Sequence, residues 1–160
     1  MLRLIIHVAA ALAVTCGFAG PAAAQQLWSG VLQVTDQTAD CAQNLFPTGV
    51  SMTSTYRPYL NGGDAPSAFM FMPSDNAGAL LFTNLDSVAQ FDGTGRYQNM
   101  SISNIATGGS FRGTYKLSQK PSVMSLRTKF VSLSGIIKNY VVSGCTLKIQ
   151  AFYTARVNGR

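Results

Sequence analysis

Several residue types that enzymes depend on are missing or nearly missing from this chain. The 160 residues contain no glutamate, and the only histidine, His7, lies in an N-terminal segment that we expect to be removed. Ser-His-Asp catalysis, Cys-His catalysis and histidine-based zinc sites all need an imidazole. The composition therefore predicts a protein that is not an enzyme and that holds no cofactor or metal ion.

The first 24 residues have the three parts of a secretory signal peptide. Arg3 supplies the positive charge, residues 4–18 form an apolar run, and Pro21-Ala22-Ala23-Ala24 ends in the small residues that signal peptidase needs. The apolar run is too short for a good transmembrane span. We therefore expect cleavage between Ala24 and Gln25. The mature chain, residues 25–160, is then a single β domain in the periplasm or outside the cell.

Cysteine is scarce, and its positions are informative. Cys16 leaves with the signal peptide, so the mature chain keeps Cys41 and Cys145. Two cysteines in an oxidising compartment most simply form one bridge. The sequence thus predicts a disulfide that joins the front of the domain to its rear.

Hydrophobic periodicity predicts an all-β domain. Apolar and polar residues alternate between clusters of turn residues, which is typical of half-buried strands in an antiparallel sheet. The clearest strands are at residues 50–57, 110–117, 124–130 and 145–156, and weaker ones are at 27–35, 67–72, 79–83 and 96–103. Residues 85–91 suit one or two helical turns, and residues 133–142 suit either a strand or a packed loop.

About eight strands in antiparallel order predict a small closed β-barrel. Cys41 follows the first strand and Cys145 opens the last, so the bridge brings the two ends of the sheet together. Closure also removes exposed strand edges. A two-sheet β-sandwich is the alternative. Its immunoglobulin form is not supported, because Trp28 precedes both cysteines.

Aromatic residues in the predicted strands are candidates for the barrel interior. They are Tyr56, Tyr97, Phe111, Tyr115, Phe130 and Tyr153. The sequence leaves open both a packed and a hollow interior, and we favour the packed one because small barrels are filled by side chains.

The few charged residues are unevenly distributed along the mature chain. Residues 25–92 hold six aspartates and one cation, whereas residues 93–160 hold ten cations and no acidic residue. If the later strands pair as hairpins, we expect one basic outer face, made of Arg112, Lys116, Arg127, Lys129, Lys148 and Arg156. Such a face keeps a protein soluble or docks an anionic partner. Insertion into a membrane is disfavoured, since cations inside a membrane barrel would lack acidic partners.

These features lead to three hypotheses for the function. The first is a non-catalytic binding module. The second is an envelope-associated structural protein whose basic face docks an anionic envelope polymer, a lipid or an acidic protein. The third, which rests on the fold analogy alone, is an inhibitor of a periplasmic enzyme. An enzyme that uses Asp or Lys stays open, whereas nucleic acid is disfavoured by the compartment and by the lack of a base-reading motif.

Overall fold

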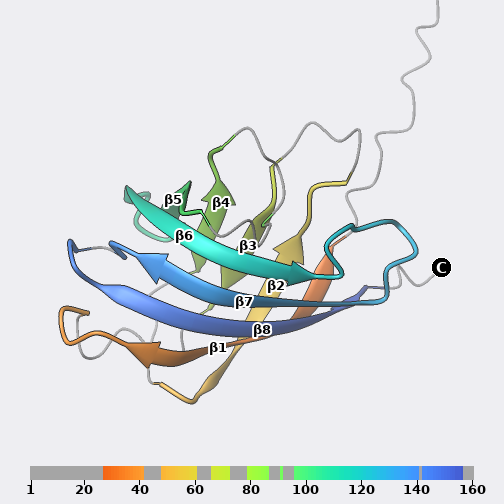
Figure 1. Ribbon diagram of the computed structural model, residues 1–160, viewed down its shortest axis with the longest axis horizontal. Helices are drawn as coiled ribbons and strands as arrows, with labels where there is room; N and C mark the ends of the chain where they lie inside the picture. Colours follow the sequence, from red (N-terminus) through yellow and green to blue (C-terminus); the bar gives the residue numbers. More distant parts are fainter. Residues whose placement is uncertain are drawn as a thin grey trace, which may run out of the picture.

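Eight antiparallel strands form a closed barrel in the computed structural model of the protein (Figure 1). The strands are β1 (Trp28–Gln37), β2 (Ser51–Arg57), β3 (Ala68–Phe71), β4 (Leu80–Asn84), β5 (Gln98–Asn104), β6 (Ser110–Lys120), β7 (Phe130–Lys138) and β8 (Thr146–Ala155). Each strand pairs with the next along the chain, and β8 pairs with β1. The predicted all-β barrel is therefore confirmed, and the sandwich alternative is wrong.

The structure describes residues 27–41, 48–60, 66–72, 79–86, 91, 96–140 and 142–156. The predicted signal peptide lies outside these residues, so its cleavage stays a prediction. Most of the expected helical segment, residues 87–90, also lies outside them, and the described residues contain no helix.

One predicted strand is displaced along the chain. We expected a strand at residues 124–130, but residues 121–129 form the loop between β6 and β7, and β7 itself is Phe130–Lys138. A strand would place Met124 and Leu126 on the same face, but in this loop Met124 turns into the core while Leu126 remains exposed. β7 covers residues 133–138 of the segment 133–142, which suited either a strand or a loop.

Aromatic side chains fill the interior of the barrel. Phe82 stacks on Phe69 and Phe71, with ring centroids 4.7 and 5.2 Å apart. Phe91 packs edge-on against Tyr115 at 5.0 Å, and Tyr56 lies 5.3 Å from Tyr153. Strands β2, β3, β4, β6 and β8 contribute these rings, and Phe91 comes from the segment between β4 and β5. An eight-strand barrel is just wide enough for side chains to fill it, and here large rings do so.

Two of the six aromatic candidates for the interior lie on the outside. Tyr56, Tyr115 and Tyr153 are buried, and Phe111 packs half-buried against the core. Tyr97 and Phe130, however, are 44% and 70% exposed. The prediction that Tyr97 and Phe130 lie in the interior is wrong. Inward and outward positions alternate along a strand, so an error of one residue in the assigned face puts a side chain on the wrong side of the wall.

The neighbours of these two residues show the correct strand faces. In β5 the inward positions are Gln98, Met100 and Ile102, so Tyr97 points away from the core. In β7 the first inward positions are Val131 and Leu133, which leaves Phe130 outside.

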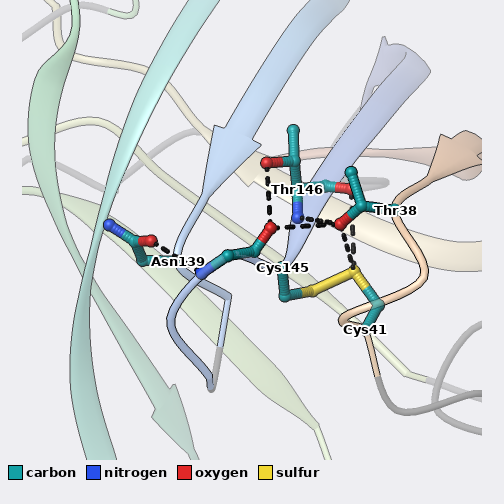
Figure 2. Close-up of a disulfide and its surroundings, with 6 residues drawn as sticks. Thr38, Cys41, Asn139, Cys145 and Thr146 are labelled. Atoms are coloured by element: carbon teal, nitrogen blue, oxygen red, sulfur yellow. Dashed lines mark hydrogen bonds between the residues drawn. A yellow bond between two sulfur atoms is a disulfide. The ribbon is translucent and has the colours of Figure 1, made fainter.

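The predicted disulfide closes the seam between β1 and β8 (Figure 2). Cys41 and Cys145 are bonded, with Cα atoms 4.5 Å apart and a sequence separation of 104 residues. Thr38 supports the bridge, since its hydroxyl donates to the Gly144 carbonyl at 3.1 Å and accepts from the Thr146 N–H at 3.0 Å. A structural disulfide of this kind indicates an oxidising environment outside the cytoplasm.

Glycine allows the close approach of strands at two places in the wall. A Cβ atom at Gly30 of β1 would clash with the carbonyl oxygen of Phe152 in β8. A Cβ atom at Gly135 of β7 would clash with the carbonyl oxygen of Lys116 in β6. Both clashes involve backbone atoms, so any larger residue must push the paired strands apart. The β1–β8 seam thus depends on a glycine near one end and on the disulfide at the other.

We predict that Gly30→Ala lowers the free energy of unfolding by at least about 2 kcal/mol, because the new methyl group meets backbone and not a flexible side chain. Urea denaturation measures this change. Gly109→Ala is the matched control, since the nearest atom to its added Cβ, Thr107 Oγ1, lies 3.4 Å away. Equal stability of the two variants would contradict the prediction.

We also predict that Cys41→Ala/Cys145→Ala lowers the free energy of unfolding by about 2–5 kcal/mol, because the bridge restricts a long loop in the unfolded chain. The wild-type protein in reductant should match the variant, and the variant should not respond to reductant. A wild-type protein whose unfolding is insensitive to reductant argues against this role.

Candidate binding surface

Polar side chains inside the barrel gather at the end where β1 begins, here called the Trp28 end. The hydroxyl of Tyr56 donates to Oε1 of Gln119, and the hydroxyl of Tyr115 donates to Oε1 of Gln98. Nε2 of Gln119 in turn donates to the carbonyl of Pro121 at 2.9 Å. These buried groups form hydrogen bonds with one another and with the backbone at the start of the β6–β7 loop. The cluster is therefore part of the core.

Burial raises the pKa values of three tyrosines well above 10.0, the ordinary pKa of a tyrosine side chain. Loss of solvent is the largest cause for Tyr56, Tyr140 and Tyr153. Hydrogen bonds with Ser67 and Ser54 oppose the rise in the pKa of Tyr56 and Tyr153, respectively. These phenols stay protonated at neutral pH, which suits hydrogen-bonded core residues.

All six cations predicted for a basic face are exposed on the outside of the barrel, but they are spread along its length. Lys116 of β6 and Lys148 of β8 share a row, with Ile136 of β7 between them. Arg112 lies on β6 toward the opposite end from Trp28. Arg127, Lys129 and Arg156 lie at the Trp28 end, where the Ala155 N–H donates to the Lys129 carbonyl at 2.8 Å.

The charge of Lys148 is compensated by a neighbour that the sequence pattern does not reveal. Its Nζ lies 2.7 Å from Oδ2 of Asp36, and the contact lowers the pKa of that carboxyl group. The register between β1 and β8 shifts between Val34 and Asp36. Because Val34 faces inward, regular alternation would turn Asp36 inward too, and the irregularity directs it to the outer face.

Three cations form a line along the outside of β6, which we call the β6 column. Arg112, Lys116 and Lys120 recur at every fourth residue, about 13 Å apart along an extended strand. Lys120 was not among the predicted residues, because the expected strand ended at residue 117. Lys138 of β7 was also missed, and it adds a cation opposite Thr114.

The surroundings of the β6 column are rich in hydroxyl groups. Ser101 of β5 pairs with Arg112, Ser132 of β7 pairs with Lys120, and Ser134 pairs with Ser118. β5, β6 and β7 contain no carboxylate. The nearby Asp86 accepts hydrogen bonds from the backbone N–H and the side-chain amide of Asn99 at 2.6 and 3.0 Å.

An exposed tyrosine lies beside this column. Nζ of Lys138 is 4.2 Å from the centre of the Tyr97 ring, which is the distance of a cation–π contact. Since Lys138 ends β7 and Tyr97 immediately precedes β5, the contact spans β6 near Thr114. Tyr97 therefore contributes an aromatic ring to the outer surface and not to the interior.

Comparison with protein-family models, with curated proteins and with solved structures finds no match to this chain. The geometry of the described residues is therefore the basis for a functional proposal. Within the described ranges, no helix has the length and apolar character needed to cross a membrane. The same ranges hold no group of three His, Cys, Asp or Glu residues placed to bind a metal ion.

The buried tyrosines predict that the barrel loses stability in alkali. Their folded pKa is raised above the ordinary value of 10.0, so the folded state keeps protons that the unfolded state releases. Their stabilising contribution is complete below about pH 10 and declines above it, by about 1.4 kcal/mol per pH unit for each tyrosine. Urea unfolding over this range, with phenolate absorbance as a second signal, measures the loss. Constant stability up to about pH 11.5 would contradict it.

Proposed function

We propose that this protein is an exported, non-catalytic binding module that holds an anionic polymer of the cell envelope against the outside of its barrel. The observation that carries the proposal is the β6 column, with three exposed cations on one strand and no carboxylate in β5, β6 or β7. The disulfide and the predicted signal peptide support a location outside the cytoplasm.

The packing of the interior supports binding on the outer surface. Phe69, Phe82 and Phe91 are at most 1% exposed, and their rings contact one another or those of Tyr56 and Tyr115. A ligand inside the barrel would have to displace them. The charged outer wall needs no such rearrangement.

The spacing of the column favours a polymer over a small anion. Arg112 and Lys120 lie about 26 Å apart, too far for one phosphate or carboxylate to contact both. A chain with repeated anionic groups contacts the cations in turn. The serine and threonine hydroxyls between them hydrogen-bond to the uncharged parts of such a chain, as in a polysaccharide.

We predict that the protein binds dextran sulfate and not neutral dextran, and that the binding weakens as salt shortens the Debye length from about 10 Å at 0.1 M to about 3 Å at 1 M. Arg112→Ser/Lys116→Ser should lower the affinity about fivefold at low salt, which is about 0.5 kcal/mol for each exposed contact. Fluorescence anisotropy of labelled polymer measures the affinity.

Two controls separate the β6 column from net charge. Asp36→Asn/Lys148→Gln removes an ion pair from the neighbouring wall and should leave the affinity unchanged. Arg57→Ser removes one cation from β2, four strands away from β6 around the barrel, and is compared with Lys116→Ser. If these two single variants lose equal affinity, binding follows net charge and the proposal is wrong.

A further inference from the structure

The loop between β6 and β7 exposes apolar side chains at the Trp28 end. Val123 and Leu126 are 63% and 67% exposed, and Phe130, which follows the loop, is 70% exposed. Single exposed apolar residues are common on protein surfaces. Three within eight consecutive positions, two in the loop and one at the start of β7, are a local concentration that calls for an explanation.

This loop is held in place by the core. Met124 is 3% exposed and serves as its apolar anchor. Nε1 of Trp28 donates to the Thr128 carbonyl at 3.1 Å, and Nε2 of Gln119 donates to the Pro121 and Ser122 carbonyls at 2.9 and 3.3 Å. These hydrogen bonds and the buried Met124 fix the loop backbone, and Val123 and Leu126 are exposed in this fixed conformation.

More exposed apolar residues lie on three strands that begin or end at the same end of the barrel as the loop. Phe130, Phe152 and Val31 line one open groove of about 380 Å³ on the outside of β7, β8 and β1. Phe152 and Val31 are directly opposite in the register and are 54% and 45% exposed. We call Val31, Val123, Leu126, Phe130 and Phe152 together the apolar end.

Cations surround the apolar end. Lys120 lines the groove, and Arg127 and Lys129 are exposed in the loop itself. Nε of Arg156 donates to Oγ of Ser29, another lining residue, at 2.5 Å. The chain from residue 93 onward contains no acidic residue, so none of these cations meets a carboxylate from β6, β7, β8 or the loop.

We infer that the apolar end docks on the surface of an anionic lipid bilayer. Leu126 and Phe130 enter the boundary between headgroups and acyl chains, and Arg127 and Lys129 contact lipid phosphates. Apolar residues interspersed with Lys and Arg are the composition of segments that lie in this boundary. Each cation near an anionic bilayer also adds attraction.

Two observations favour a bilayer over a protein partner or a soluble polymer. Lysine is depleted in the cores of protein–protein interfaces, whereas here Lys120 lines the groove and Lys129 adjoins Phe130. A soluble anionic polymer pairs with the cations but leaves Leu126 and Phe130 in water. The apolar end shares only Lys120 with the β6 column, and its apolar residues and loop cations are not part of that column, so this inference does not require polymer binding.

The test is co-sedimentation of the full mature protein with vesicles. We expect binding to vesicles of phosphatidylglycerol and phosphatidylcholine, and at least about tenfold weaker binding to phosphatidylcholine alone. Leu126→Ser/Phe130→Ser should weaken binding to the anionic vesicles about tenfold. Arg127→Ser/Lys129→Ser should weaken it by a similar factor at low salt and by less at high salt.

Ile105→Ser/Val142→Ser is the matched control, because it removes two exposed apolar residues, 55% and 44% exposed, from the disulfide end of the barrel. It should bind vesicles like the wild type, as should Arg112→Ser/Lys116→Ser. The inference is wrong if the wild type does not sediment with anionic vesicles, if both vesicle types bind it equally, or if the control loses as much as Leu126→Ser/Phe130→Ser. Dextran sulfate binding without vesicle binding removes this inference and leaves the proposed function intact.

Discussion

The pairing of β8 with β1 is the constraint on which the rest of this structure depends. It gives every strand two neighbours and removes the free edges of the sheet. The Cys41–Cys145 bridge ties the seam at one end, and Gly30 permits the close strand approach toward the other. Once the sheet is closed, each strand has one face inside and one face outside. The positions of the functional candidates on the strands follow from that division.

Closure also decides where binding can take place. The interior of an eight-strand barrel suits side chains, and this one is filled by stacked aromatic rings with a hydrogen-bonded polar cluster at the Trp28 end. That cluster reaches the β6–β7 loop through Gln119 and holds it in position. The packed core therefore also holds the loop in the conformation that exposes Leu126 and places it before the exposed Phe130.

The strands that carry the β6 column and the groove of the apolar end, β6, β7, β8 and β1, lie side by side in the barrel wall (Figure 1). Lys120 ends the β6 column and also lines the groove of the apolar end. The polymer and bilayer proposals therefore call for anionic partners on one side of the molecule. A protein that sits on a lipid surface and holds a polymer alongside it meets both chemical requirements.

Period-two alternation and the positions of two cysteines were enough to predict most of the strands and the disulfide, and they favoured a closed barrel over a sandwich without excluding the sandwich. The tertiary structure decided the faces of Tyr97 and Phe130, the start of β7, and the compensation of Lys148 by Asp36. The physical reason is the short repeat of a strand: a shift of one residue at a loop or an irregular register exchanges inside for outside. No local pattern reports such a shift, and only the pairing of neighbouring strands settles it.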